Sequence, residues 1–418
     1  MTVEELYKLY IVNYLVDTDT RTIRKNCLFF ALKGDNFNGN KFATEAIAKG
    51  AKFCIIDEKE FEIKGKTILV NNVLKTLQDL AKYHRKQLNI PVIALTGSNG
   101  KTTTKELIKK VLQQKYKTAA TKGNLNNHIG VPLTLLSITP KEEIAIIEMG
   151  ANHQKEIAFL SNIINPDYGY ITNFGKAHLE GFGGVEGVIK GKSELYTHLK
   201  QNNKTAFINP NDAIQLEKTK DSKTILLKEN IKFIGANPFV ELSYHKTIIK
   251  SNLIGEYNYN NIAIAITIGD FFKVENNKIK EAIESYVPKN NRSQIIQKGN
   301  NHIILDAYNA NPSSMTAAIH NFAQLAEKSK TIILGDMFEL GEDSAKEHQE
   351  IANLTDSRAF NATYYVGEHF SKTNTKNLKF TDFEALKVYL TKAPLNNQSI
   401  LIKGSRGMQL ERVLELIN

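Results

Sequence analysis

The run Thr96-Gly-Ser-Asn-Gly-Lys-Thr-Thr103 constrains the fold of this chain more than any other segment. It follows an apolar, β-branched stretch at residues 90–95 that is typical of a buried strand, and residues 101–114 after it are typical of a helix. In that setting the backbone N–H groups of a glycine-rich turn and the helix N-terminus bind phosphate. Leu95 stands where the longer motif has glycine, so the run has the shorter T-G-x-x-G-K-T form. The alternative is a chance Gly-Lys-Thr turn, and the strand–turn–helix context favours a triphosphate site.

The same alternation of strand and helix continues along the chain. Strands are predicted at residues 144–148, 168–172, 302–306, 331–334, 362–366 and 399–402, and helices at residues 313–328, 344–353, 382–390 and 408–417. Continuous apolar strands separated by helices indicate mostly parallel sheets covered on both faces. Residues 27–32 and 53–56 predict the strands of a smaller α/β unit, which follows a helix in the first 15 residues.

We therefore predict an α/β fold with three domains at residues 1–85, 86–290 and 291–418. The polar run Pro288-Lys-Asn-Asn-Arg-Ser293 is the expected linker before the last domain. A length of 418 residues suits two or three domains of about 150 residues each.

Composition narrows the class of protein. Hydrophobic residues make up 42% and charged residues 23%, which is typical of a globular protein. The net charge of +10 comes from scattered lysines, which favours small anionic ligands, or a genome-wide lysine bias, over nucleic acid. Two cysteines, Cys27 and Cys54, are too few for a disulfide framework. No signal peptide is expected, and the longest apolar stretch, residues 262–272, is too short to span a membrane, so we predict a cytoplasmic protein.

Three polar residues outside the glycine-rich run are ambiguous by pattern alone. Glu148 ends a predicted strand, where it either meets a ligand or its Mg²⁺, or caps the next turn. By pattern alone a lone histidine such as His178 is more often a surface or satisfied side chain than a ligand, and Lys192 has the pattern of a solvated helix lysine.

Taken together, the motifs resemble the Mur ligase family over nearly the whole chain. In order they are Leu28-Phe-Phe-Ala-Leu-Lys-Gly34, the run Thr96–Lys105, Gly123-Asn-Leu-Asn-Asn-His-Ile-Gly-Val-Pro132, Glu148-Met-Gly-Ala151, Ala177-His-Leu-Glu-Gly-Phe182, Gly191-Lys-Ser-Glu194, Asp306-Ala-Tyr-Asn-Ala-Asn-Pro312, Leu334-Gly-Asp-Met-Phe-Glu-Leu-Gly341 and Lys403-Gly-Ser-Arg406. The blocks at residues 308–312 and 335–341 resemble the branch of the family that adds D-alanyl-D-alanine.

The resemblance implies an ATP-dependent amide ligase that joins D-alanyl-D-alanine to UDP-N-acetylmuramoyl-tripeptide, through an acyl phosphate, to make the pentapeptide precursor of peptidoglycan. It implies a monomer whose first domain binds the UDP-sugar, whose central domain binds ATP and whose last domain brings the dipeptide. Because the implied site residues lie on both sides of the linker, we expect the last domain to close during the reaction. Two alternatives are a sibling ligase, which adds the third residue or resembles folylpolyglutamate synthase, and a P-loop NTPase that acts as a switch.

The resemblance also assigns roles around ATP. The catalytic group is Lys101, Glu148, His178 and Lys192. Thr102 and Glu148 would hold one Mg²⁺, and His178 with a carbamylated Lys192 a second; His178 alternatively orders the acyl phosphate or a water. ATP would contact Gly97, Ser98, Asn99, Gly100, Lys101, Thr102, Thr103, Asn258, Asn261, Arg292 and Asp306. By pattern alone the two asparagines could instead cap a helix. Tyr257 replaces the family's usual His, and Asn291 replaces a usual Gly.

The implied substrate contacts are spread over all three domains. They are Thr20 and Arg21 for the uridine diphosphate, Asn124, Asn126 and Asn127 for the muramoyl-peptide, and Tyr308, Asn309, Asn311 and Arg406 for the dipeptide. Turn formation is the alternative for the first three asparagines, and a surface arginine is the alternative for Arg406. Asn38 and Asn40 stand where the family often has Asp and His.

Overall fold

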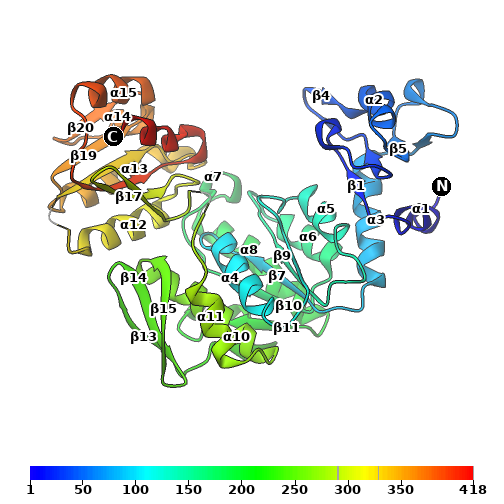
Figure 1. Cartoon of the computed structure of the whole chain (residues 1–418), viewed down its shortest axis with the longest axis horizontal. Helices are drawn as coiled ribbons and strands as arrows, with labels where there is room; N and C mark the ends of the chain where they lie inside the picture. The colour runs from blue at the N-terminus through cyan, green and yellow to red at the C-terminus, as the bar shows by residue number, and fades with distance from the viewer. Residues whose placement is uncertain (290, 328, 418) are drawn as a thin grey trace.

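The computed structural model describes residues 1–289, 291–327 and 329–417. It shows three α/β domains, with the N-terminal and C-terminal domains at opposite ends of the long axis and the central domain between them (Figure 1). The predicted fold class is therefore confirmed. The predicted boundaries at residues 85/86 and 290/291 stay a prediction, and Asn290, Lys328 and Asn418 lie outside the described residues.

The N-terminal domain is built on a parallel sheet of order β1-β2-β5-β6. Both cysteines are buried in the small apolar cluster on one face of this sheet. Its elements are α1 (Val3–Tyr10), β1 (Val16–Asp17), η1 (Thr20–Thr22), β2 (Leu28–Phe30), β3 (Lys33–Gly34), β4 (Phe37–Asn38), η2 (Gly39–Phe42), α2 (Ala43–Ala48), β5 (Phe53–Ile56), η3 (Lys59–Phe61), β6 (Thr67–Leu69) and α3 (Val73–Gln87).

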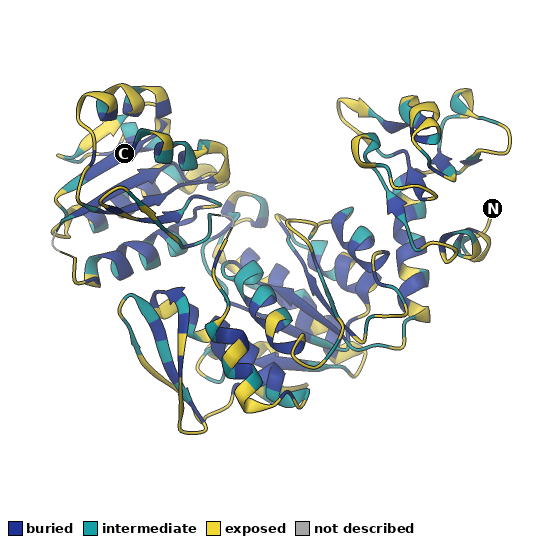
Figure 2. Cartoon of the chain, viewed as in Figure 1, coloured by how far each residue is buried: buried dark blue, intermediate teal, exposed yellow. Residues whose placement is uncertain are grey.

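The central domain contains a fully parallel sheet of order β12-β11-β10-β7-β9-β8. Its core strands are buried along their whole length, as their continuous apolar sequences predict (Figure 2). The elements of this sheet and its helices are β7 (Val92–Thr96), α4 (Lys101–Leu112), β8 (Thr118–Ala120), α5 (Gly130–Leu135), β9 (Ile144–Glu148), α6 (Glu156–Ile164), β10 (Tyr168–Ile171), α7 (Leu179–Phe182), α8 (Val185–Gln201), β11 (Thr205–Ile208), α9 (Ala213–Lys218) and β12 (Lys223–Leu226).

The order of this sheet positions the glycine-rich loop. After β7 the chain crosses to one side of that strand, through β8 and β9, and then to the other side, through β10 and β11. Open parallel sheets bind ligands at the carboxyl ends of such neighbouring strands, where the chain changes direction. The loop after β7 and the loop after β10 therefore lie together at one edge of the sheet.

A three-stranded antiparallel sheet, which the sequence did not lead us to expect, follows the central sheet. It has the order β13-β14-β15. Its apolar side chains belong to the same buried cluster as those of α4 and of the two helices that follow the sheet. In β14 buried and half-buried residues alternate, so one face of this strand is covered. The elements are β13 (Ile231–Ala236), β14 (Phe239–Tyr244), β15 (Thr247–Ile254), η4 (Glu256–Asn258), α10 (Tyr259–Phe271) and α11 (Asn276–Glu284).

The C-terminal domain has a six-stranded sheet of order β16-β17-β21-β18-β19-β20, parallel except for the edge strand β16. Its elements are β16 (Gln294–Lys298), β17 (Asn301–Asp306), α12 (Pro312–Gln324), β18 (Lys330–Gly335), η5 (Gly341–Asp343), α13 (Ser344–Asp356), β19 (Ala362–Val366), α14 (Glu368–Ser371), β20 (Leu378–Phe380), α15 (Phe383–Lys392), β21 (Ser399–Lys403), η6 (Arg406–Met408) and η7 (Leu410–Leu416).

The helix predicted at residues 408–417 is wrong, because this segment forms 3₁₀ turns. Gln409 has a φ of 50°, which interrupts a right-handed helix, and Arg412 donates to the carbonyls of Met408 and Gln409. The apolar stretch at residues 262–272 is mostly the buried helix α10. Among the described residues, no helix combines the length and apolar character needed to cross a membrane.

Candidate active site

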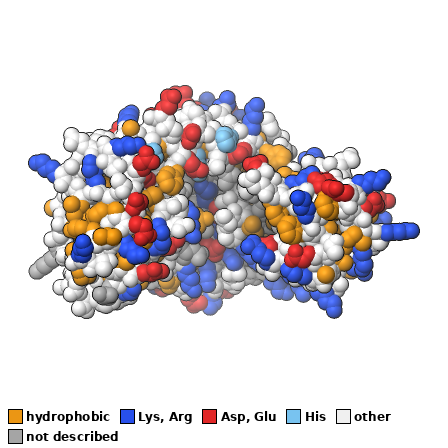
Figure 3. Space-filling view, turned by 90° about the horizontal axis from the view of Figure 1, so that it is seen from above, with side chains coloured by type: hydrophobic (Ala, Val, Ile, Leu, Met, Phe, Trp, Pro, Cys, Tyr) orange, Lys and Arg blue, Asp and Glu red, His pale blue; other side chains and the backbone are white. Residues whose placement is uncertain are grey.

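A cavity of about 820 Å³ lies between the central and C-terminal domains, lined by residues of both. The space-filling view shows the molecule hollowed between its two ends, with basic and acidic side chains mixed over the visible face (Figure 3). One wall carries the glycine-rich loop and Glu148, and the other carries residues that follow β17. Phosphate-binding and peptide-binding groups predicted from separate parts of the sequence therefore face one space.

The glycine-rich loop is held in place by the loop after β10. The N–H of Ser98 donates to the carbonyl of Asn173, and the N–H of Asn99 donates to its side-chain oxygen at 3.1 Å. Gly100 has a φ of 79°, and a Cβ there would lie 2.8 Å from Asn261 Oδ1, so both backbone angle and space favour glycine. Helix α4 begins at the next residue, which directs its N-terminus at the cavity.

Lys101 and Lys192 are two lysines whose surroundings disfavour the charged form. Burial lowers the pKa of Lys101 to about 8; the charge of Arg292 adds to this effect and that of Glu148 opposes it. The Lys101 amine donates to the carbonyls of Gly97 and Ser98, at 2.6 and 3.2 Å. Burial also holds the pKa of Lys192 well below its usual range, with a further contribution from Lys101. The surroundings of Lys192 therefore favour the neutral amine more than water does.

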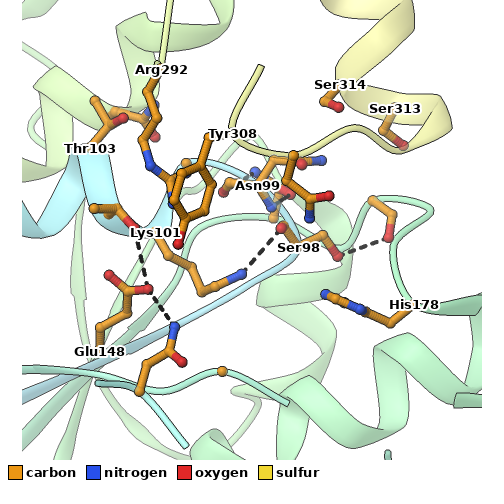
Figure 4. Close-up of a pocket in the computed structure, with 18 of the residues that line it drawn as sticks. Ser98, Asn99, Lys101, Thr103, Glu148, His178, Arg292, Tyr308, Ser313 and Ser314 are labelled. Carbon is orange, nitrogen blue, oxygen red and sulfur yellow. Dashed lines mark hydrogen bonds between the residues drawn. The ribbon is translucent and has the colours of Figure 1, made fainter. Parts of the chain in front are cut away.

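Glu148 is a buried carboxylate at the end of β9. Its Oε1 accepts from the Thr102 hydroxyl at 3.3 Å and from Asn126 Nδ2 at 2.9 Å (Figure 4). Its Oε2 is buried and accepts no hydrogen bond from the described residues. A carboxylate with one unused oxygen beside a hydroxyl is a donor set that suits a hard cation such as Mg²⁺.

On the opposite wall two positively charged side chains, Arg292 and Lys403, each have a partner. The Arg292 guanidinium lies 3.7 Å from the centre of the Tyr308 ring (Figure 4). Asp306 ends β17, and its carboxylate accepts from Lys403 Nζ at 2.6 Å and from the N–H of Ser293 at 3.2 Å. The C-terminal wall is thus ordered by its own internal pairs.

Two of the positions that depart from the family pattern, Tyr257 and Asn291, have a local explanation. The Tyr257 hydroxyl lies 2.9 Å from Ser293 Oγ, a hydrogen bond that joins the end of the central domain to the start of the next. Asn291 has a φ of 56°, a conformation that glycine adopts freely and that asparagine tolerates better than most residues.

Asn258 and Asn261 line the cavity but are also bonded to each other. Asn258 Nδ2 donates to the carbonyl of Ile254, and its Oδ1 accepts from Asn261 Nδ2 at 2.8 Å. Asn261 Oδ1 accepts from the Thr104 hydroxyl of α4. Neither side chain caps α10, so the capping alternative is wrong here. The pair instead fixes α10 against the helix that begins at the glycine-rich loop.

Several polar contacts between side chains connect the central and C-terminal domains beside the cavity. Asn99 and Asn311 exchange side-chain hydrogen bonds of 2.8 and 3.3 Å. Lys176 pairs with Glu347 at 2.5 Å. His178 Nδ1 lies 2.5 Å from Glu339 Oε2, and this contact lowers the pKa of Glu339.

Most, though not all, of the predicted site residues line the cavity. Those that do are Ser98, Asn99, Gly100, Lys101, Thr102, Thr103, Asn124, Asn126, Asn127, Glu148, His178, Asn258, Asn261, Arg292, Asp306, Tyr308 and Asn309. Asn127 also accepts from the N–H groups of Ile129 and Gly130, as its turn-forming alternative predicts.

The other predicted residues lie outside the lining: Gly97, Lys192, Asn311, Thr20, Arg21 and Arg406. Lys192 is buried just behind the wall, with its amine 3.2 Å from the carbonyl of Ala151, which does line it, and 4.8 Å from the Phe182 ring centre. Arg21 and Arg406 are exposed and pair with Asp19 and Glu411, at 2.6 and 2.7 Å.

Sequence reasoning missed several residues of the lining. Asn173, Ser313 and Ser314 received no role, and Lys403 was quoted only as part of a motif. Asn173 follows a predicted strand end, which is the signal that could have found it. Lys403 pairs with Asp306 because β17 and β21 are neighbours in the sheet, although the two strands lie far apart in sequence.

The three-domain α/β fold, the glycine-rich loop and the strand-end carboxylate define a protein of the phosphate-loop class. Models of three Mur ligase domains match the chain: the family's catalytic domain at residues 14–95, the middle domain at 95–269 and the glutamate ligase domain at 291–406. The UDP-N-acetylmuramoyl-tripeptide–D-alanyl-D-alanine ligase of Bacillus subtilis is 32% identical, over 96% of this chain and 92% of that protein.

Solved structures agree with this assignment. A crystal structure of MurF from Acinetobacter baumannii matches with a TM-score of 0.85 at 30% identity, over 96% of this chain and 92% of that one. MurF ligase from Thermotoga maritima in complex with ADP matches with a TM-score of 0.84 at 27% identity, over 96% of both chains. The chain belongs to the Mur ligase family.

Proposed function

We propose that this chain is the ATP-dependent ligase that joins D-alanyl-D-alanine to UDP-N-acetylmuramoyl-tripeptide and releases ADP and phosphate. The observation that carries the proposal is one cavity bounded by a phosphate loop on one side and, on the other, by Tyr308 and Asn309 of the motif at residues 308–312. The relative from Bacillus subtilis has this activity in its name and aligns over nearly the whole chain. A ligase of this kind works in the cytoplasm on its ATP supply, and we propose a monomer.

The nucleotide site combines residues of both walls. The Thermotoga maritima relative binds ADP, and we assign the ATP phosphates of this chain to the loop at residues 97–103. The N–H groups of the loop and the N-terminus of α4 favour the negative phosphates. Asn258 of the central domain and Arg292 and Asp306 of the C-terminal domain line the cavity, and we assign adenine and ribose to them.

The residues fit one Mg²⁺ well. Thr102 and Glu148 would hold it, because their oxygens are adjacent and Glu148 Oε2 accepts no hydrogen bond from the described residues. When bound, the ion would neutralise charge between the triphosphate and the attacking carboxylate. Lys101 lines the same cavity and adds a second positive group there.

A second Mg²⁺ is supported by the chemistry of the Lys192 amine more than by the positions of His178 and Lys192. His178 contacts Glu339, and Lys192 lies behind the wall, so these two side chains would have to move to share an ion. The neutral amine favoured at Lys192 is the form that attacks CO₂. A C–N bond forms, a proton leaves to solvent, and the resulting carbamate oxygens are metal ligands. We keep the carbamylated Lys192 as part of the proposal on this ground.

The reaction follows from the charges in the site. A carboxylate oxygen of the tripeptide attacks the γ-phosphorus, and the P–O bond to ADP breaks, which leaves an acyl phosphate. The amine of the dipeptide then attacks the acyl carbon and loses a proton, and phosphate departs. Both attacks bring anions or partial charges together, so preorganised positive groups such as Lys101 lower the barrier.

The other substrate contacts are proposed as the motifs suggest. Asn124, Asn126 and Asn127 line the cavity beside Glu148 and are assigned to the muramoyl-peptide, while Tyr308 and Asn309 are assigned to the dipeptide. Thr20 and Arg21 would contact the uridine diphosphate from the N-terminal domain. Asn311 and Arg406 lie outside the lining and would reach the dipeptide only after the C-terminal domain closes.

That closure has its own test. Small-angle scattering should show a smaller radius of gyration when an ATP analogue and UDP-N-acetylmuramoyl-tripeptide are added together. An unchanged radius would contradict closure, and with it the roles given to Asn311 and Arg406.

The alternatives predict different products. A sibling ligase would require another amino acid, and an NTPase switch would release phosphate without any amine. We would incubate the protein with ATP, Mg²⁺ and UDP-N-acetylmuramoyl-tripeptide, with and without D-alanyl-D-alanine, and measure phosphate and product mass. The proposal predicts phosphate release that needs both substrates and a product heavier by the dipeptide less water. Release that does not depend on the dipeptide would contradict it.

A further inference from the structure

Lys105 is a fully buried lysine one helical turn after Lys101, and the reaction described above does not use it. Its side chain is wholly inaccessible, and its amine donates to the carbonyl of Thr121 at 2.6 Å. The amine also lies 3.2 Å from Glu106 Oε1 and 3.7 Å from Glu148 Oε2. A buried charge is costly unless a partner compensates it, so a lysine in this place calls for an explanation.

Thr121 connects Lys105 to the backbone of Glu148. The Thr121 carbonyl accepts from Lys105, while its hydroxyl accepts from the N–H of Glu148 at 2.9 Å. Thr121 follows β8, which is the neighbour of β9 in the sheet. Lys105 therefore fastens helix α4, which begins at the glycine-rich loop, to the strand end that presents Glu148.

The two carboxylate oxygens of Glu148 have different neighbours. Thr102 and Asn126, which line the cavity, both donate to Oε1. Oε2 accepts no hydrogen bond among the described residues and has Lys105 as its nearby cation. Lys105 can thus compensate the charge of Oε2 while leaving its lone pairs free for a ligand.

We propose that Lys105 is a positioning residue, which holds Glu148 from behind at the orientation and charge needed to bind the nucleotide's divalent cation. The inference deepens the proposed function and rests on it for the identity of the nucleotide. Outer partners that orient and charge-balance a metal ligand change metal affinity when they are removed, without touching the metal.

The first test measures cation binding and not turnover. Calorimetry with a non-hydrolysable ATP analogue gives the Mg²⁺ concentration needed for half-maximal nucleotide binding. Lys105→Met should raise that concentration by about 10- to 100-fold. The matched control is Lys330→Met, since Lys330 is also buried and donates to a carbonyl, that of Ala323, far from Glu148 in the C-terminal domain. Lys330→Met should leave the Mg²⁺ requirement unchanged, and an unchanged requirement in Lys105→Met would overturn the proposal.

A double-mutant cycle covers the case in which Lys105→Met folds poorly. If the two charges act as a pair, the loss of unfolding midpoint caused by Lys105→Met should be much smaller in a Glu148→Gln background. Losses that simply add in the double variant would overturn the proposal. Neither experiment uses the tripeptide or the dipeptide. A failure of the ligase assay with a normal Mg²⁺ result would therefore count against the proposed function alone.

Discussion

The two junctions of the central domain are built in different ways. At the N-terminal junction, α3 inserts buried polar side chains into the central domain. His84 Nε2 donates to the carbonyl of Ile138, and Arg85 donates to the carbonyls of Ile164 and Asn165 and pairs with Asp167 at 2.8 Å. The apolar cluster around these bonds contains residues of both domains and continues into the C-terminal domain, so the polar contacts are what distinguish the two junctions.

At the C-terminal junction the polar contacts lie beside the cavity and are partly exposed. Lys176 and Glu347, His178 and Glu339, and Asn99 and Asn311 each join one side chain from either domain. Partly exposed ion pairs contribute little net stability, so such contacts exchange easily. The difference indicates a rigid N-terminal junction and an adaptable C-terminal junction that contains the site. Changes at the first should affect folding, and changes at the second should affect turnover.

The largest effect is expected from Arg85→Met at the rigid junction. Removing this buried guanidinium leaves the carbonyls of Ile164 and Asn165 without their partner and takes one of two cations from Asp167, which keeps Lys204, so the free energy of unfolding should fall by about 3–5 kcal/mol. Chemical denaturation measures the loss. Arg358→Met, at an exposed arginine, is the control and should change stability by less than about 0.5 kcal/mol. Equal losses in the two variants would remove the contrast between the junctions.

Lys101→Met, at the adaptable junction, should reduce turnover and leave stability unchanged. It removes a preorganised positive group from the phosphate loop, and kcat should fall by about 100- to 1,000-fold. Stability should not fall, because the environment of Lys101 already disfavours its charge. Lys110→Met, on the exposed side of the same helix, should keep full turnover. Steady-state kinetics together with thermal unfolding would check both, and a variant that turns over normally would contradict the assigned phosphate site.

Acid should weaken the rigid junction in particular. Burial lowers the pKa of His84 below its usual range, so the unfolded chain takes up a proton that the folded chain resists. The stability this histidine contributes is complete above the unfolded value of about 6.5 and is lost as the pH falls below it. Unfolding measured between pH 7.5 and 5 should therefore show declining stability, with a smaller decline in His84→Gln. If stability declined equally steeply with falling pH in both proteins, His84 would not contribute to the acid sensitivity.

The smallest effect is expected from Lys176→Met at the adaptable junction. The Lys176 side chain is 38% exposed, so the loss of its ion pair with Glu347 should cost no more than about 1 kcal/mol in unfolding free energy. Denaturation would measure this directly beside Arg85→Met. A cost as large as that of Arg85→Met would mean that both junctions are rigid.

The elements that were predicted correctly are those whose signals come from residues close together in the sequence. The strand at residues 362–366 and the glycine-rich turn were found because their signals are local, and β9 begins and ends where its apolar run does. The antiparallel sheet β13–β15 was missed because no motif drew attention to a segment whose strands pair only with each other. The false helix at residues 408–417 shows how one left-handed residue, Gln409, ends a pattern that otherwise suits a helix.

The candidate site was predicted as a set of motifs and not as contacts. Asn99 and Asn311 are 212 residues apart, and nothing in their sequence neighbourhoods indicates that they bond. The position of Lys105 behind Glu148 likewise depends on the order of β8 and β9 in the sheet. Such pairs follow from topology, which sequence periodicity leaves open. The roles of the individual site residues stay predictions that the variants above can test.

The central claim is that the tripeptide carboxylate is activated by phosphorylation within this cavity. Its most direct test uses UDP-N-acetylmuramoyl-tripeptide whose terminal carboxylate carries ¹⁸O, with ATP, Mg²⁺ and D-alanyl-D-alanine. The account predicts that the released phosphate contains one ¹⁸O atom from the carboxylate, since the acyl C–O bond breaks when the amine attacks. Phosphate that contains no ¹⁸O would contradict the acyl phosphate route and the function built on it.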